Sequence, residues 1–569
     1  MRPFRSAVLG GTALALSAGA ALAQQSPPQV TPLAPQVTPR DLRPPEPAAS
    51  AAPLPVPAPN AVPAQARDLQ VSVDEVRFID GFPELAAACA ALAAPLRGRR
   101  QTVAAFYQLA DAVEALYREA GYPLVRVVVP PQQVKDGGVF ALRVVDGYLE
   151  RIDASAVPER ARRAVEQALA GLLGRRHLRG EALERALTLA GRGPGLQMRS
   201  ALGAGEAVGG TVLVLEGEHV GSAITVSADR RLSESLGPWQ TTVQLRLNQA
   251  LGRGEQFYTY ASGGKDWGTA WRDDAPRRVL GGGAILPLTA DGLSLNPEFT
   301  VSDTQPRAPA GALRSRSQLE RYSLRLIYPL LLTRAQELTL TGTFDASRQI
   351  DSLPDFDFVM SEDKLRVGRI AADYVRNGES ARLRVGATLS RGLPGLGART
   401  AADIAATGVP VSRYGARPYF TKLEFNASAD VELPWGLGAR TSARLQSALG
   451  HVLPSAELFS LDGEDALSTF RSGAISDDNG WTLRQELSRA WTPTVGGAGL
   501  QLQPYVFAAM GRPWSEFAGS QGHRLAASGG AGLRTRWRGA ELSVEAGRRR
   551  YRPFGLDEFQ AFVKAQVQF

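Results

Sequence analysis

Apolar and polar side chains alternate with a period of two along most of the chain after residue 221. Segments of about ten residues repeat this alternation, for example TTVQLRLNQ from Thr241, YSLRLIYPL from Tyr322 and ELSVEAGRRR from Glu541. A strand with this period has one apolar and one polar face. Residues 221–569 are therefore predicted to consist of β-strands.

The connections between these segments fall into two classes of length. NQALGRGEQ, VRNGES and PWGLGA are tight, whereas residues 264–277, 305–317, 392–417 and 452–479 are long and polar. Short turns at one end and long loops at the other are typical of a transmembrane barrel, and a soluble sandwich would not usually separate them in this way. About sixteen strands would each have roughly 22 residues, connection included. We therefore expect a mainly β protein with an antiparallel transmembrane barrel of about sixteen strands.

The last segment, FQAFVKAQVQF, continues the alternation to the C-terminus. Its two faces suit lipid and a wet lumen. One face holds Phe559, Ala561, Val563, Ala565, Val567 and Phe569, and the other holds Gln560, Phe562, Lys564, Gln566 and Gln568. The terminal aromatic, Phe569, also resembles the signal by which the barrel-assembly machinery recognises outer-membrane proteins.

Two regions of mixed periodicity precede the predicted barrel. Residues 68–147 contain a strand at 71–79, helices at 86–96 and 102–120, and strands at 124–130 and 139–147. Residues 148–220 repeat the plan, with a strand at 148–154, helices at 158–173 and 180–190, and strands at 196–203 and 211–217. Each region is predicted to be a small α+β domain.

The N-terminus differs in character from the rest of the chain. Residues 1–23 place two arginines before an apolar stretch that ends in Ala-Leu-Ala, which is the pattern of a secretory signal and is too short for a spanning helix. Residues 24–67 contain thirteen prolines, which prevent a helix over most of this stretch. We interpret them as an extended linker.

Composition argues against several kinds of site. A single cysteine, Cys89, cannot form an internal disulfide, and the four histidines show no zinc-ligand spacing. The net charge of +8 is too diffuse to indicate nucleic-acid binding. Because the chain also has neither a GxxxxGK[ST] phosphate loop nor an evident catalytic triad, we expect no enzyme activity, no cofactor and no metal site.

The order of these parts resembles the TpsB-type transporters of two-partner secretion, which include the haemolysin and filamentous-haemagglutinin secretion proteins. Residues 117–152, YREAGYPLVRVVVPPQQVKDGGVFALRVVDGYLERI, are similar to the passage from the family's first POTRA domain to its second. Residues 453–487 are similar to the loop and strand that hold its Val-Arg-Gly-Tyr motif. The resemblance implies two periplasmic POTRA domains, a barrel in the outer membrane of a Gram-negative bacterium in contact with its lipid, and a secreted TpsA-type passenger as the partner.

The loop motif departs from the family pattern. In the family its arginine points into the barrel and pairs with the aspartate of a Phe-x-Asp-x-Gly pattern on a nearby strand. The motif here reads Phe470, Arg471, Ser472 and Gly473, and the second pattern has Phe507, Ala509 and Gly511, with alanine in place of the aspartate. A buried arginine needs a partner.

Three arrangements of Arg471 remain open. Another acid can serve as its partner, and Asp477, Asp478, Asp462 and Glu464 are the nearest in sequence. The loop can be held less firmly than in the family, or Arg471 can be an ordinary solvated residue. Some relatives plug the pore with an N-terminal helix; the proline-rich segment here leaves that task to the long loop or to an extended linker.

The resemblance implies that an unfolded passenger docks on the POTRA domains by adding a strand to a sheet edge. We expect the docking groove in the first domain, between the strand at 124–130 and the helix beside it. The residues expected to form this groove are Leu124, Val125, Val127, Val129, Val103, Phe106 and Tyr117. The barrel would then be a passive conduit. An outer-membrane insertase is the main alternative, although insertases usually carry more POTRA domains, and a pore for small solutes would need no POTRA domains.

Overall fold

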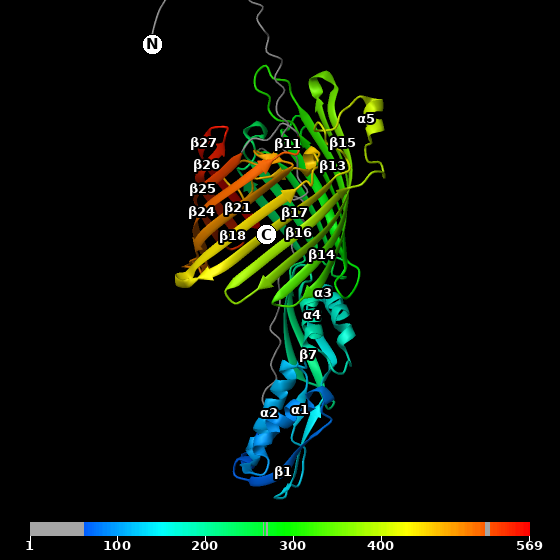
Figure 1. The fold of residues 1–569 in the computed structure, drawn as a ribbon, viewed down its shortest axis with the longest axis vertical. Helices are drawn as coiled ribbons and strands as arrows, with labels where there is room; N and C mark the ends of the chain where they lie inside the picture. The colour runs from blue at the N-terminus through cyan, green and yellow to red at the C-terminus, as the bar shows by residue number, and fades with distance from the viewer. Residues whose placement is uncertain (1–61, 266, 269–270, 518–523) are drawn as a thin grey trace, which may run out of the picture.

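The computed structural model describes residues 62–265, 267–268, 271–517 and 524–569. These residues form two small α+β units and a closed β-barrel, and the first unit lies farthest from the barrel (Figure 1). The predicted secretory signal and most of the predicted linker lie outside the described residues.

The barrel is a single antiparallel sheet of sixteen strands, closed by pairing of the last strand with the first. This confirms the fold class expected from the alternating pattern. The strands in chain order are β8 (Ser222–Asp229), β9 (Gln240–Asn248), β10 (Gln256–Gly263), β11 (Arg277–Pro287), β12 (Ser294–Thr304), β13 (Arg316–Leu332), β14 (Gln336–Leu353), β15 (Phe358–Asn377), β16 (Ala381–Gly392), β17 (Thr421–Leu433), β18 (Leu437–Ser447), β21 (Asn479–Arg489), β24 (Gln501–Trp514), β25 (Leu525–Trp537), β26 (Ala540–Arg552) and β27 (Leu556–Gln568).

Three neighbouring strands are much longer than expected. β13, β14 and β15 have 17, 18 and 20 residues, compared with the about ten that cross a bilayer. The pairing of β14 with β15 begins at Gln336 opposite Arg376 and continues to Leu353 opposite Phe358. Each added pair satisfies backbone donors and acceptors, so the hairpin can continue beyond the length that the membrane requires.

The first unit contains a four-stranded sheet in the order β2-β1-β4-β3 and two helices. Its elements are β1 (Gln70–Ile79), α1 (Ala86–Ala93), β2 (Arg100–Thr102), α2 (Val103–Glu119), β3 (Arg126–Val128) and β4 (Gly138–Val145). β3 is shorter than the strand predicted at 124–130, because a turn at Tyr122–Val125 precedes it and Pro130 and Pro131 have no N–H to donate.

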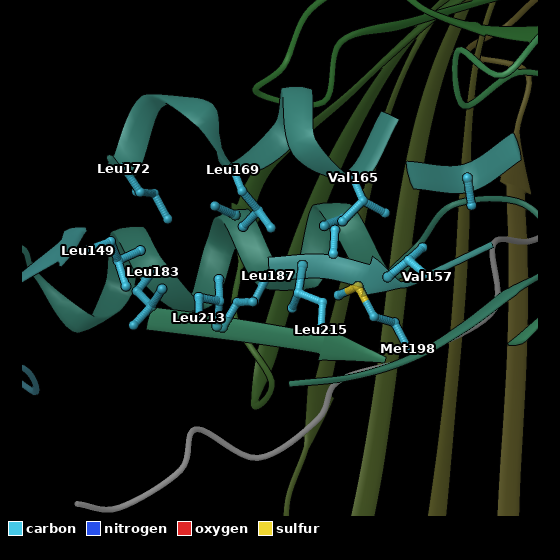
Figure 2. Packing of buried hydrophobic residues seen from close by; sticks show 14 of the residues in the cluster. Leu149, Val157, Val165, Leu169, Leu172, Leu183, Leu187, Met198, Leu213 and Leu215 are labelled. Carbon is cyan, nitrogen blue, oxygen red and sulfur yellow. The ribbon is translucent and has the colours of Figure 1, made fainter. Parts of the chain in front are cut away.

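The second unit contains a three-stranded sheet in the order β5-β7-β6, with two helices packed on it. Its elements are β5 (Tyr148–Ala156), α3 (Glu159–Leu169), α4 (Gly180–Gly191), β6 (Leu196–Ala204) and β7 (Gly210–His219). Figure 2 shows its core, in which Leu169 and Leu183 of the helices meet Leu213 and Leu215 of β7. Leu124, from the connection between α2 and β3 of the first unit, is buried in this same core and joins the two units.

The second unit is attached to the short turns of the barrel. Arg185 of α4 donates to the carbonyl oxygens of Pro329 (2.6 Å) and Asp291 (2.9 Å), in and beside the turns before β14 and β12. Arg192, just after α4, forms an ion pair with Glu337 at the start of β14. We call this end of the barrel the short-turn end and the opposite one the long-loop end.

One short helix lies in the long connection between β16 and β17. It is α5 (Ala401–Thr407), which begins with a capping box between Thr400 and Asp403. None of the helices in the described part of the chain is both long and apolar enough to cross a membrane.

Candidate functional site

A cavity of about 2130 Å³ extends from the second unit into the barrel. Its wall includes Arg163 and Gln167 of α3 at the short-turn end and the strand residues Arg321 and Lys422 farther in. Asp462, from the connection between β18 and β21, also lines it. We call this connection, residues 448–478, the inner loop. The lumen is thus open toward the second unit and bounded by the inner loop.

The inner loop crosses the lumen. It contacts inward side chains of β15 and β17 through Glu457, and it contacts β27 through the 3.0 Å ion pair of Glu464 with Lys564. β15 and β27 are half the ring apart in the closed strand order. A segment that reaches both must run through the barrel interior.

Apolar packing holds one part of the inner loop against the wall. Phe459 and Ser460 form the short strand β19 (Phe459–Ser460), which pairs with β20 (Ser476–Asp477). The buried cluster comprises Phe459, Leu461, Leu467, Phe470 and Ile475 of the loop together with Ala509 of β24 and Ala526 of β25. Ala509, where the family has aspartate, therefore packs against apolar side chains of the loop.

Two wall glycines allow this close approach. A Cβ at Gly480 would lie 2.5 Å from Cδ1 of Phe459, and one at Gly511 would lie 3.2 Å from Cδ2 of Leu461. Real Cβ atoms do not approach ring carbons to 2.5 Å, so any side chain at position 480 would displace the phenylalanine. At Gly511 the tightest contact of such a Cβ is with the backbone oxygen of Trp481 on the neighbouring strand, at 2.8 Å, so this glycine serves the packing of the wall as well as that of the loop.

A buried carboxylate anchors the inner loop to the opposite wall. Glu457 lies at the end of a short 3₁₀ helix (Ser455–Glu457), and only 3% of its surface is exposed. Its two oxygens accept from the Arg369 guanidinium at 2.6 and 3.1 Å, and one of them lies 3.0 Å from Lys422 Nζ. Arg369 also contacts Asp345 of β14 at 2.8 Å. Buried charges persist only when they are paired in this way.

A second polar network holds the loop near β8 and β26. Arg231 donates to the carbonyl oxygen of Ser468 at 2.9 Å. Arg484 of β21 bonds to the Ser468 hydroxyl and pairs with Glu545 of β26 at 3.0 Å. The guanidinium of Arg484 also stacks over the ring of Phe507, 3.9 Å from its centroid. Phe507, the first residue of the second motif, therefore faces the lumen and supports an arginine other than Arg471.

Arg471 finds its partner outside the inner loop. It donates to the carbonyl oxygen of Leu232 at 2.9 Å and forms an ion pair with Glu234, both in the connection between β8 and β9. Of the three arrangements left open by the sequence, the structure has an acid partner, and this acid lies in another connection. The backbone N–H of the neighbouring motif residue Ser472 donates to the carbonyl oxygen of Arg231, and the N–H of Gly473 donates to the carboxylate of Asp462 at 3.0 Å.

Two of the four acids that were candidates for this role, Asp477 and Asp478, have other arginine partners. Asp477 forms an ion pair with Arg524, between β24 and β25. Asp478 pairs with Arg413, between β16 and β17, and accepts from the backbone N–H of Leu453 at 2.8 Å. Both acids therefore connect the inner loop to neighbouring loops at the long-loop end.

The predicted docking groove in the first unit is filled. Leu124, Val125, Val127, Phe106 and Tyr117 are buried in hydrophobic cores, and Val103 and Val129 pack against the core of the first unit. In addition, the carboxylate of Glu114 on α2 accepts from the backbone N–H of Val127 at 2.8 Å and from Arg126 at 2.8 Å. The side chains cannot line an open groove, and an edge donor of β3 is already occupied.

The C-terminal residue takes part in barrel closure. The N–H of Phe569 donates to the carbonyl oxygen of Ile224 on β8 at 2.9 Å, and its carbonyl oxygen accepts from Ile224 at 3.1 Å. Its side chain is 74% exposed on the membrane-facing side. On the inner face of β27, Phe562 is buried under the Arg231 guanidinium, which explains an aromatic residue on the otherwise polar face.

These features define an outer-membrane β-barrel transporter with N-terminal POTRA domains. The chain belongs to the haemolysin secretion/activation family of ShlB, FhaC and HecB, whose model matches residues 209–535. The model of the ShlB-type POTRA domain matches residues 71–147. Both matches confirm the family resemblance of the sequence, and the family is one of protein transporters, not of enzymes.

Known relatives agree with this assignment. The haemolysin transporter protein ShlB of Serratia marcescens is 24% identical over 449 residues, which cover 78% of this chain and 75% of that protein. The structure of CdiB from Escherichia coli matches 91% of this chain and 94% of its own, with a TM-score of 0.71 at 20% identity. CdiB from Acinetobacter baumannii matches 91% of this chain and 95% of its own, with a TM-score of 0.62 at 15% identity. The two structures share the fold.

Sequence reasoning missed one deeply buried anchor of the loop, Glu457. Glu457 is one of several acids in a long connection, and Arg369 and Lys422 are charged residues on alternating strands. Arg369 lies 88 residues and Lys422 lies 35 residues before Glu457 in the sequence. A charged residue on the polar face of a barrel strand is expected everywhere, so no local signal could have singled out these three.

Proposed function

We propose that the chain exports one secreted passenger protein of the TpsA type through its lumen. The proposed organisation is a signal at 1–23, a linker at 24–67, POTRA domains at 68–147 and 148–220 in the periplasm, and the barrel at 221–569. The observation that carries the proposal is the cavity, which begins at the second POTRA domain and runs into the barrel. It gives an extended chain a continuous path from the docking domains to the inner loop.

The docking edge that we propose is β6 of the second POTRA domain. β6 is one of the two end strands of its sheet and has nine residues, compared with three in β3. It runs from the junction with the first domain to Leu196, beside the barrel, where Gln249 donates to Pro194. Gln197 on β6 also lines the cavity. A passenger strand added along β6 would therefore be directed into the lumen.

Alternation along β6 identifies the amides that such a strand would use. The N–H of Val220 donates to Gly195 and that of Gly205 donates to Gly210, so odd-numbered residues of β6 bond to β7. In an antiparallel pair, the N–H and C=O groups of the alternate, even-numbered residues point away from the partner strand. The N–H of Ser200 thus points away from β7, toward the edge where a passenger strand would pair.

Ser200→Pro tests this docking edge. The substitution removes the outward N–H without removing a bond to β7, which edge strands tolerate. We expect secretion of the passenger to fall at least about ten-fold, since every passenger strand loses a backbone bond and its register. Ser200→Ala keeps the N–H and is expected to secrete normally.

Passenger in the medium and transporter in the outer membrane would be measured together. Normal secretion by Ser200→Pro, with heat-modifiable migration unchanged, would contradict docking on β6. The insertase alternative makes a different prediction, because loss of an insertase would lower the amounts of many other outer-membrane barrels. Unchanged amounts of those barrels alongside lost passenger would support secretion.

The inner loop is proposed to act as the gate of this path. It spans the lumen between β15 and β27, so a polypeptide can pass only if the loop moves. Export needs no nucleotide in this scheme, and folding of the passenger outside the cell would bias its movement outward. The ion pairs of Glu457, Glu464 and Arg471 set how firmly the gate is closed.

A further inference from the structure

The membrane-facing side of β26 changes from apolar to basic toward the long-loop end. Alternate residues of this strand face outward. In chain order they are Leu542, Val544, Ala546, Arg548, Arg550 and Arg552. The intervening residues face the lumen, where Glu545 is buried and Arg549 lies over the ring of Phe470. Three arginines thus occupy positions where a barrel strand usually presents apolar side chains to lipid.

The arginines are outward and accessible. The side chains of Arg548 and Arg550 are 63% and 53% exposed, and both contact Asp557 of β27. A fourth outward arginine is Arg512 of β24. Its neighbour Gly511 pairs with Ala526 of β25, and Ala526 pairs with Tyr551 of β26. The next residue along each outer strand, Arg512 on β24 and Arg552 on β26, therefore lies at the same height in the sheet. Two strand spacings separate Arg512 from Arg552, which is about 10 Å. One carboxylate among four guanidinium groups leaves the cluster positively charged.

The height of the cluster places it at the outer rim. β26 ends at Arg552 on the long-loop side, away from the turn after Trp537 that leads into it. Arg548 is four residues from this end, or about 10 Å along the membrane normal for a tilted strand. The outward residues of β26 below the cluster, Leu542, Val544 and Ala546, are apolar, as the lipid-facing band of a barrel strand is. Trp481, paired with Arg512, marks the interface as membrane-boundary aromatic residues do.

We propose that Arg512, Arg548, Arg550 and Arg552 bind the phosphate groups of a phosphorylated glycolipid in the outer leaflet. Guanidinium groups present paired donors that match phosphate oxygens. The cluster faces lipid, so its ligand carries acyl chains that cover the apolar face of β25 to β27 while its headgroup phosphates meet the arginines. Asp557 holds Arg548 and Arg550 side by side, which orients their remaining donors.

The test uses the purified full-length chain in detergent and diphosphoryl lipid A as the probe. The variant is Arg548→Gln/Arg550→Gln/Arg552→Gln. The matched control, Arg489→Gln/Arg536→Gln/Arg538→Gln, removes three exposed arginines at the short-turn end. We expect the rim variant to bind the probe at least about ten-fold more weakly, because charge-assisted bonds to three groups are lost. The control should stay within about two-fold of the parent chain.

Two further arms identify the source of the phosphate. Dephosphorylated lipid A should bind the parent chain as weakly as the probe binds the rim variant, and inorganic phosphate at millimolar concentration should not displace the probe. Equal binding by rim variant and parent, equal binding of dephosphorylated lipid, or displacement by inorganic phosphate would each overturn the proposal. If the triple variant loses heat-modifiable migration, Arg552→Gln alone is measured, and binding equal to that of the parent would overturn it as well.

Discussion

Glu457 offers the sharpest test of how the inner loop is held in the lumen. Glu457→Gln keeps the shape of the side chain and removes its charge. The carboxylate is 3% exposed and faces two cations, Arg369 at 2.6 Å and Lys422 at 3.0 Å. Its loss leaves Arg369 with Asp345 and Lys422 with the more exposed Glu424.

The expected magnitude follows from the charges that remain. Removing one member of a buried pair costs about 3–5 kcal/mol, and the surviving acids place this case near about 3 kcal/mol. If the substitution destabilises only the state in which the inner loop lies in the lumen, the fraction of molecules with the loop outside it rises by about two orders of magnitude. The loop should then leave the lumen often enough to be seen as current.

Single-channel recording in planar bilayers measures this directly. Glu457→Gln should show frequent open events of high conductance, compared with rare ones in the parent protein. The matched control is Glu424→Gln, which removes an acid from the same lysine but at a position that is 37% exposed, and should cost at most about 1 kcal/mol. Glu457→Gln/Lys422→Met, which restores the charge balance, should recover part of the closure.

One outcome would contradict this role of Glu457. If Glu457→Gln and Glu424→Gln both retain the conductance of the parent protein, the buried carboxylate does not hold the loop. Heat-modifiable migration of each variant would show that the barrel itself is folded.

Three other expectations follow from the same structure. Arg471→Ala should lower export modestly, by an effect worth about 1 kcal/mol, because its partner Glu234 is 70% exposed; export equal to that of the parent would identify Arg471 as an ordinary surface residue. Gly480→Ala should increase open events, since the new Cβ meets the Phe459 ring at 2.5 Å, and unchanged recordings would show that the ring moves aside freely. Burial raises the pKa of the Cys89 thiol, so maleimide should label it only when denaturant unfolds the first POTRA domain, whereas fast labelling of the native protein would contradict its burial.

The sequence alone determined those features of this protein that depend on residues close together in the chain. A period of two decides which side chains face lipid and which face the lumen, and the turn lengths separate the two ends of the barrel. Sixteen strands and two α+β units followed from these patterns. The helix and strand bounds of both units shifted by only a few residues, except where prolines shortened β3.

The tertiary structure decided which residues meet. Arg471 pairs with Glu234, 237 residues earlier, and Glu457 pairs with Arg369, 88 residues earlier. Neither pair has a spacing that a sequence pattern can reveal, because closing the barrel brings distant strands and loops around one lumen. The same is true of the first-unit edge, where Glu114 on α2 occupies the amide of Val127 once helix and strand are packed. Periodicity specifies the face on which a residue lies, and packing in three dimensions specifies its partner.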